Sequence, residues 1–239
     1  MNKQDLIEIY ENTKIVSSFI PTPLSEKFSH FFPRKEKIQI SVEPIDTISA
    51  LIKYHSTGKT AILNMASSIR KGGGVAKGAM AQEECLFRAS NLYTISDELY
   101  PLGITDFIYT EGATFIKNSD HRLMEPIKAD VITIAAPNMN KENKHYNPNE
   151  LEGFDYTSIL EIKITQILNA ADHYGCKNII LGAWGCGVFK NDPSLMAIRF
   201  KDIITENRYN FERIIFAIIN DDNSVDNNYE FFRKTFNEI

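Results

Sequence analysis

Cysteine is scarce in this sequence, and the few copies are not arranged in pairs. Among 239 residues there are three cysteines, Cys85, Cys176 and Cys186, and no CxxC motif. An odd and widely spaced set of this kind is typical of reduced thiols rather than of a disulfide framework. The five histidines show neither HxxxH nor HxH spacing, so we expect no metal site and no cofactor.

Long hydrophobic runs and an excess of basic residues are also missing. No stretch of about 18 apolar residues occurs, and the first residues include acids instead of the apolar core of a signal peptide. We therefore expect a cytoplasmic protein without membrane contact, and a monomer. The formal net charge of −5 argues against a general nucleic-acid-binding protein.

Apolar runs alternate with amphipathic stretches along the chain. Near-continuous apolar strands separated by helices indicate an α/β fold with three layers, and nothing in the chain marks a domain boundary. The predicted strands are 37–42, 60–66, 106–110, 113–117, 129–136, 178–184 and 213–220. The predicted helices are 3–16, 46–55, 82 to about 96, 153–174, 192–207 and 226–238. The polar segment 138–151 is expected to be a loop.

The first glycine-rich segment follows the strand predicted at 60–66. Gly72, Gly73 and Gly74 are consecutive, and such a run suits a backbone that must approach a ligand closely or adopt positive φ. After a spacer of seven residues the chain reads Gln82-Glu83-Glu84 at the start of a helix. Acids at a helix N-terminus can simply be stabilised by the macrodipole. A tight glycine loop directly before them instead favours a carboxyl group placed against a ligand that backbone amides hold.

The second glycine-rich segment, LGAWGCGVFKNDP, follows the strand predicted at 178–184. Its small residues allow successive backbone N–H groups to point into one concavity, which suits a diphosphate. The segment matches neither a Walker A loop nor GxGxxG. Phe189 can pack in the core or stack on a sugar or base, and the sequence leaves both readings open. Cys186 has no neighbouring histidine, so we interpret it as a small residue in a tight loop rather than a nucleophile.

Together these segments resemble one family. GGG followed by seven residues and QEE fits the signature of the poly(ADP-ribose) glycohydrolases, and LNMAS, ITIAAPN and LGAWGCGVF are similar to segments of the compact microbial type. The resemblance covers roughly 60 to 220. It implies a macrodomain-like three-layer α/β/α sandwich with a mixed central sheet, formed by residues 1–239 as one domain. Residues 1–37 would be an N-terminal helical extension packed on it.

The resemblance also implies roles for individual residues. Glu84 would be the catalytic acid–base residue, and Glu83 would bind ribose hydroxyls and orient the scissile bond. Because neighbouring helix residues diverge by about 100°, we expect Glu84 to act alone, first as acid and then as base, rather than with Glu83 as an opposed pair. The implied substrate-binding residues are Asn64, Ser67, Gly72, Gly73, Gly74, Val75, Gln82, Asn138, Gly185, Cys186, Gly187, Val188 and Phe189.

Three departures from the family bear on the substrate. Arg70 and Lys71 stand where related sequences often have proline, Met80 stands where a basic residue is common, and the tyrosine-bearing hairpin of the large animal enzymes has no clear counterpart. We therefore expect hydrolysis of ribose–ribose bonds mainly at terminal units of poly(ADP-ribose) on modified proteins. A mono-ADP-ribosyl-protein hydrolase, for instance one acting on modified arginine, and a non-catalytic ADP-ribose reader are the alternatives. Arg70, Lys71 and the loop 138–151 would line the region beyond the terminal ribose.

Overall fold

A computed structural model describes residues 2–18, 20, 25–26, 38–143, 145–147, 151, 153–220 and 227–237. The strands are β1 (Ser25–Glu26), β2 (Gln39–Glu43), β3 (Thr60–Met65), β4 (Ile108–Lys117), β5 (Leu123–Ile134), β6 (Asn178–Leu181) and β7 (Arg213–Ala217). The α-helices are α1 (Lys3–Ser17), α2 (Thr47–Tyr54), α3 (Gln82–Ala89), α4 (Tyr156–His173), α5 (Pro193–Glu206) and α6 (Asn228–Phe236). A short 3₁₀ helix, η2 (Val75–Lys77), precedes α3.

These strands all belong to one mixed sheet, in the order β1-β4-β5-β3-β6-β7-β2. The five strands from β5 to β2 run parallel, whereas β4 pairs antiparallel with β5, and β1 pairs antiparallel with β4. The carboxyl ends of the five parallel strands therefore meet at one edge of the sheet. In open α/β sheets, this edge is where ligands bind.

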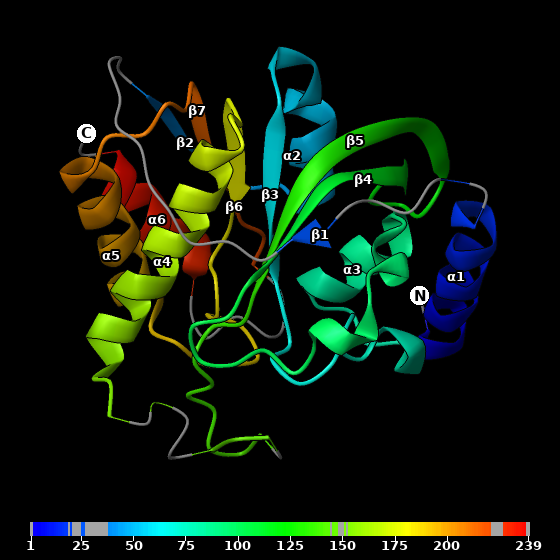
Figure 1. Ribbon diagram of the computed structural model, residues 1–239, viewed down its shortest axis with the longest axis horizontal. Helices are drawn as coiled ribbons and strands as arrows, with labels where there is room; N and C mark the ends of the chain where they lie inside the picture. The colour runs from blue at the N-terminus through cyan, green and yellow to red at the C-terminus, as the bar shows by residue number, and fades with distance from the viewer. Residues whose placement is uncertain are drawn as a thin grey trace.

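Helices cover both faces of the sheet (Figure 1). On one face lie α4, α5 and α6, which bury Ile164, Phe200 and Phe232 against the strands. On the other face lie α2 and α3, which bury Leu51 and Phe87, and α1 packs beside α3. Strands buried on both faces are expected to contain near-continuous apolar runs, and β3, the second half of β5 and β7 contain such runs. The predicted three-layer α/β/α sandwich with a mixed sheet is confirmed.

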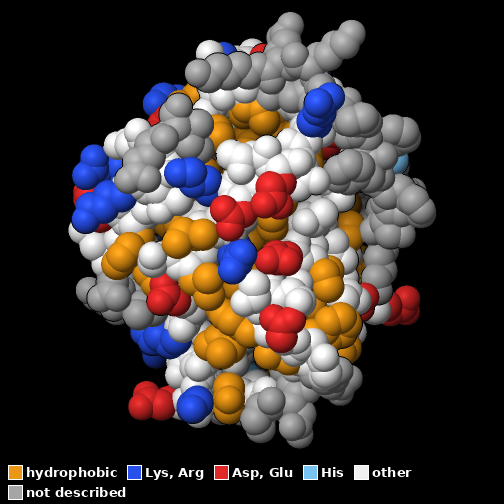
Figure 2. Space-filling view, turned by 90° about the vertical axis from the view of Figure 1, so that its left-hand side faces the viewer, with side chains coloured by type: hydrophobic (Ala, Val, Ile, Leu, Met, Phe, Trp, Pro, Cys, Tyr) orange, Lys and Arg blue, Asp and Glu red, His pale blue; other side chains and the backbone are white. Residues whose placement is uncertain are grey.

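The outer surface on the α5 side of the molecule has a mixed character. Figure 2 shows hydrophobic side chains there interspersed with acidic and basic ones. Within the described ranges, no helix combines the length and the apolar character needed to cross a membrane.

The structure corrects several element boundaries. Helix α3 ends at Ala89 rather than near residue 96, because Ser90 adopts an extended conformation and bridges to Phe115. The segments 106–110 and 113–117 lie in one strand, β4, since Gly112, with φ of 66°, allows an irregularity in its register. Strand β5 begins at Leu123, before the predicted start at 129. Of residues 1–37, α1 and β1 are described, and most of the rest lies outside the described residues.

Candidate active site

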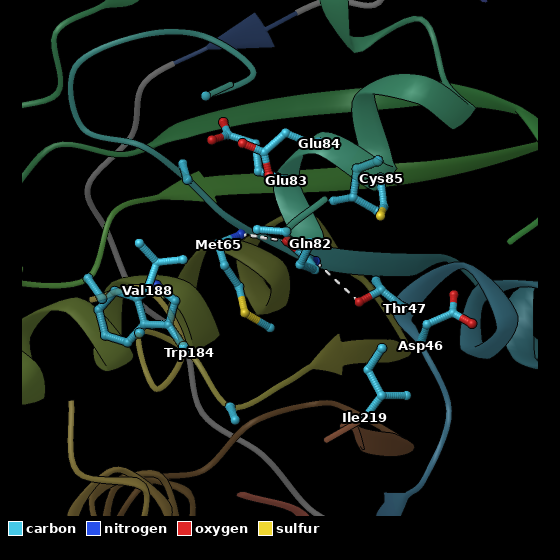
Figure 3. Close-up of a pocket in the computed structure, with 18 of the residues that line it drawn as sticks. Asp46, Thr47, Met65, Gln82, Glu83, Glu84, Cys85, Trp184, Val188 and Ile219 are labelled. Atoms are coloured by element: carbon cyan, nitrogen blue, oxygen red, sulfur yellow. Dashed lines mark hydrogen bonds between the residues drawn. The ribbon is translucent and has the colours of Figure 1, made fainter. Parts of the chain in front are cut away.

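A cleft of about 280 Å³ opens at the edge where the parallel strands end (Figure 3). Loops after β3, β5, β6 and β7 and the N-terminus of α2 contribute to its walls. The predicted site residues that line it are Ser67, Gly73, Gln82, Glu83, Glu84, Gly185, Gly187, Val188 and Phe189. The two glycine-rich segments are far apart in the chain but face one cavity, as expected from their places after neighbouring strands.

Gln82 fixes the start of α3 to the end of β3. Its Oε1 accepts a hydrogen bond of 2.9 Å from the backbone N–H of Met65, and its Nε2 donates to the carbonyl of Leu63 at 2.6 Å. The same Nε2 donates to Oγ1 of Thr47 on α2 at 3.2 Å (Figure 3). The amide is therefore occupied by protein groups. Gln82 was expected to bind substrate. In the structure its side-chain amide instead holds the start of α3 in place, and this positions the two acids that follow it.

Glu83 is held in a buried position by two neighbours. The backbone N–H of Ser67 donates to Oε2 at 2.8 Å, and Nδ2 of Asn64 donates to Oε1 at 3.4 Å. Glu83 is 3% exposed. Burial raises the pKa of Glu83 to about 8 despite the hydrogen bond from Ser67, and the charge of Glu84 contributes to the rise. Glu83 therefore retains its proton near neutral pH.

Glu84 combines one anchored and one free carboxylate oxygen. The backbone N–H of Gly74 donates to its Oε1 at 2.8 Å. Its Oε2 is buried and has no hydrogen-bond partner among the described residues, and Glu84 lines the cleft. A buried carboxylate oxygen without a partner is costly unless a ligand uses it. Glu84 is therefore the side chain in this cleft that is best placed for chemistry.

Gly73 explains why the loop needs glycine. Its φ is 55°, in the left-handed region, and a Cβ atom there would lie 2.5 Å from Oε1 of Glu84 and 2.9 Å from Oε2 of Glu83. Both carboxylates therefore approach the same glycine, and Figure 3 shows them close together. The Cβ atoms of the two acids point about 100° apart around the helix, but their carboxyl groups still come close together. The two carboxyl groups therefore do not face each other across a space for the substrate.

The second glycine-rich segment presents unused backbone donors to the cleft. In the part of the chain that the structure describes, the N–H groups of Gly185, Gly187, Val188 and Phe189 donate to no protein acceptor. Gly185 has φ of 76°. Successive free N–H groups around a left-handed residue form a concavity for anions. This geometry suits the diphosphate predicted for the segment.

Asn191 holds this second loop in place. Its Nδ2 donates to the carbonyls of Pro137 and Gly185, each at 2.9 Å, and its Oδ1 accepts from Oη of Tyr156 at 2.6 Å. The loop after β5 is thereby joined to the loop after β6. Sequence reasoning missed this residue, because two of its partners are distant along the chain and no local pattern marks it.

The other predicted site residues lie behind the cleft wall. Asn64 is buried beneath Glu83 and also donates to Thr133, so it braces the acid. Cys186 is buried in the core with its Sγ directed to the carbonyl of Trp184. Asn138 is buried, and its Oδ1 accepts from the N–H of Asn140. Gly72, Gly74 and Val75 shape the loop without lining the cleft.

Sequence reasoning also missed the far end of the cleft. Asp46, Thr47 and Ile219 line it there, and Figure 3 shows them apart from the two acids. Met65 and Asn228 also line the cleft. The rule that ligands lie at the carboxyl ends of parallel strands also applies to β2 and β7. Applied to those strands, it would have pointed to the segments that follow them.

A metal is not suggested by the side chains that the structure describes. No group of three or more His, Cys, Asp or Glu residues among them could hold a metal ion. The absence of a cofactor stays a prediction.

The comparisons with known proteins agree with this geometry. Residues 3–107, which include α1, the glycine loop and both acids, match the family described as microbial-type PARG, catalytic domain, where PARG is poly(ADP-ribose) glycohydrolase. The structure of a point mutant of poly(ADP-ribose) glycohydrolase from Thermomonospora curvata matches with a TM-score of 0.79 and 25% identity, over 98% of this chain and 100% of that chain. The resemblance to microbial-type PARG is confirmed.

Two ligand-bound PARG structures are also similar to the chain. The enzyme from Deinococcus radiodurans in complex with ADP-ribose has a TM-score of 0.75 and 26% identity, over 99% of this chain and 92% of that one. The Thermomonospora curvata enzyme bound to the inhibitor ADP-HPD has a TM-score of 0.74 and 25% identity, over 98% of this chain and 97% of that one. No curated protein matches the sequence significantly.

Proposed function

We propose that this protein hydrolyses ribose–ribose O-glycosidic bonds of poly(ADP-ribose), mainly at terminal units, and releases ADP-ribose. The observation that carries the proposal is the carboxylate of Glu84, a residue of the cleft wall, whose Oε1 is held by Gly74 and whose Oε2 is buried without a partner among the described residues. The PARG structures that the chain resembles contain ADP-ribose or ADP-HPD. An ADP-ribose reader has no use for a second acid after Glu83.

The cleft offers a separate place for each part of ADP-ribose. The terminal ribose would lie against Gly73, with its anomeric carbon near Glu84, while Glu83 would bind a ribose hydroxyl. The diphosphate would accept hydrogen bonds from the free N–H groups of residues 185 and 187–189. The adenine would reach the far end beside Thr47, where apolar walls and a few polar groups suit a base.

The reaction needs one proton and one water. Glu84 would donate a proton to the departing ribose oxygen as the bond to the anomeric carbon breaks, and the carboxylate that results would remove a proton from the attacking water. The water oxygen then bonds to the anomeric carbon, and Glu84 regains its proton. Because the pKa of Glu83 is raised to about 8, Glu83 is itself neutral near pH 7 and can donate a hydrogen bond to a ribose hydroxyl. The oxocarbenium-like charge would be stabilised by the nearby diphosphate.

Release of ADP-ribose from purified polymer tests this proposal directly. We expect Glu84→Gln to lower the rate by at least about a hundredfold, whereas calorimetry should still detect ADP-ribose binding. A matched control is Glu111→Gln, since Glu111 is half exposed and pairs with Lys59 away from the cleft. Full activity of Glu84→Gln would refute the assignment. A wild-type protein that binds ADP-ribose but never releases it would instead be a reader.

A second candidate function is removal of single ADP-ribose units from proteins. Nη2 of Arg70 lies 3.5 Å from Nε2 of His145, so the residue before the glycine loop and one described residue of the segment 138–151 lie close together. Lys71, expected to line this region, instead donates to carbonyls of the segment 93–95. Polymer and an arginine-modified protein should be assayed side by side. Turnover of the modified protein alone would favour this second function.

Four further predictions accompany the proposal. We propose one domain over residues 1–239, supported by a single sheet and by the packing of α1 against α3. We also propose that the substrate is carried by modified proteins. The monomeric state and the cytoplasmic location stay predictions.

A further inference from the structure

A buried cation lies one helical turn after Glu84. Arg88 is on α3 and is 0% exposed, although it does not line the cleft. Its Nε donates to the carbonyl of Leu6 on α1 at 3.1 Å, and its Nη2 donates to the carbonyl of Ala79, in the loop before α3. The guanidinium thus joins α1 to the loop that leads to the acids.

The N-terminal helix meets the same loop at a second point. A Cβ atom at Gly78 would lie 2.5 Å from the carbonyl oxygen of Lys3, so the backbones of α1 and the loop are in direct contact. Oγ1 of Thr13 on α1 also donates to the backbone carbonyl of Arg88. The segment 78–81 is therefore held between α1 and α3.

A short chain of contacts leads from Arg88 to the acid. Ala79, whose carbonyl binds Arg88, donates its own N–H to the carbonyl of Gly74 at 3.2 Å. Gly74 in turn donates its N–H to Oε1 of Glu84 at 2.8 Å. A displacement of Ala79 would move Gly74, and with it the donor that sets the direction of the carboxylate.

The burial of this charge is itself informative. Removing a guanidinium from water costs free energy. In such a position an apolar residue of similar size often gives a folded protein of equal or greater stability. Arg88 Nη1 has no hydrogen-bond partner among the described residues, so the site does not repay the cost in full. An apolar side chain at this position could not donate hydrogen bonds to the carbonyls of Leu6 and Ala79, as Arg88 does.

We propose that Arg88 is a positioning residue, which fixes the carboxylate of Glu84 through Ala79 and Gly74. This inference rests on the proposed function. A misplacement of about 1 Å in a catalytic group can cost about a hundredfold in rate. The nucleotide end of the cleft, beside Thr47 and Val188, is not part of this contact chain, so ADP-ribose affinity should change little.

Lys117 provides a matched control. It is also a buried cation that donates to α1, with its Nζ 2.9 Å from the carbonyl of Ile9 and 2.6 Å from Oγ1 of Thr13. Through Thr13 it reaches the backbone carbonyl of Arg88 but not the guanidinium, and no described contact joins it to Ala79 or Gly74. Lys117→Met therefore removes a buried cation beside α1 while both hydrogen bonds of the Arg88 guanidinium stay in place.

The test compares Arg88→Met, Arg88→Lys and Lys117→Met with the wild type at a temperature where all are folded. We expect Arg88→Met to lower kcat between about tenfold and about a hundredfold with unchanged affinity for ADP-ribose, and Lys117→Met to keep the wild-type kcat. Arg88→Lys keeps the charge but cannot bridge both carbonyls, so its kcat should also fall. Wild-type kcat in Arg88→Lys, or equal losses in Arg88→Met and Lys117→Met, would overturn the inference.

Hydrogen exchange separates this inference from the proposed function. The amides of Gly74 and Ala79 should exchange faster in Arg88→Met than in the wild type and in Lys117→Met. This measurement needs no turnover. If the wild type released no ADP-ribose, the proposed function would fail while the contact chain could still be observed. Unchanged exchange at both amides in Arg88→Met would refute the contact chain itself.

Discussion

The backbone N–H of Gly74 donates to Oε1 of Glu84 at 2.8 Å, so the glycine loop and the first turn of α3 form one unit. The loop supplies the donor, and the helix supplies the acid. Beside them lies Gly73, where a side chain has no room because both carboxylates approach it. The spacing between the triple glycine and the acids is thus a geometric requirement of this unit.

Gly73→Ala should therefore impair turnover more than folding. The added Cβ would lie 2.5 Å from Oε1 of Glu84, and we expect kcat to fall at least about tenfold as the carboxylate is displaced. Gly175→Ala is the matched control, because Gly175 has a similar φ of 70° but no atom within 4 Å of an added Cβ. Both variants should lose about 1 kcal/mol of stability from left-handed strain. Equal kcat values in the two variants would contradict the explanation.

The pH dependence of stability should report the buried proton of Glu83. Its pKa is raised from an ordinary value near 4.5 to about 8, so the native state binds this proton more tightly than the unfolded chain does. The stabilisation is complete below the ordinary pKa and is lost as pH rises through about 8, with a slope of up to roughly 1.4 kcal/mol per pH unit.

Glu83→Gln removes this titration and offers a direct test. The Gln amide can still accept from Ser67, and its NH₂ group can donate to Oδ1 of Asn64, which has no partner in the described residues. Urea denaturation at several pH values between about 5 and about 8 gives the unfolding free energy of both proteins. We expect the wild type to lose stability with rising pH relative to Glu83→Gln. Parallel curves would show that Glu83 does not titrate in this window.

Features of the fold and of the site could be predicted from the sequence where the residues that determine them are close together in the chain. The triple glycine and the acids are close in the chain, and the central strands contain long apolar runs, so both the loop and the three layers could be predicted. The end of α3 could not, because no glycine or proline marks it and the bridge between Ser90 and Phe115 requires the folded sheet.

The roles of individual polar side chains were harder to predict. Gln82 was expected to bind substrate because it adjoins the acids, yet its amide is used by Met65, Leu63 and Thr47. Nothing local reveals that these groups meet. The far wall near Ile219 likewise depends on β7 lying beside β6 and β2, a strand order that a single sequence does not contain.

Phe189 has two readings, core packing and stacking on the ligand, and two variants separate them. It is half-buried, packs against the core and lines the cleft. Phe189→Leu keeps most of the apolar volume but removes the ring, whereas Phe189→Ala removes both. If the ring stacks on the ligand, both variants should weaken ADP-ribose binding by about threefold to about tenfold, and only the alanine should cost substantial stability. Wild-type affinity in Phe189→Leu would support the core reading.

Asn191 should control the affinity for ADP-ribose without contacting it. Asn191→Ala leaves the buried carbonyls of Pro137 and Gly185 without this donor, and we expect a loss of about 2 kcal/mol of stability. The carbonyl of Gly185 then keeps only the hydrogen bond from the backbone N–H of residue 191. The left-handed conformation of Gly185 should be less fixed, so the N–H groups of residues 185 and 187–189 should converge less well on the diphosphate. Affinity measured by calorimetry should fall roughly tenfold, which corresponds to about 1.4 kcal/mol.

Asn178→Ala is the control for this last prediction, because it separates a general loss of stability from a specific loss of ADP-ribose affinity. Asn178 is equally buried, and its Nδ2 donates to Oγ1 of Thr57 and of Thr60, at the start of β6 away from the cleft. Its loss should lower stability by a similar amount, since the bonds removed are of the same kind. ADP-ribose affinity should stay at the wild-type level. If both variants weakened binding alike, the effect of Asn191 would be a general consequence of instability, and the second loop would not be the anion site.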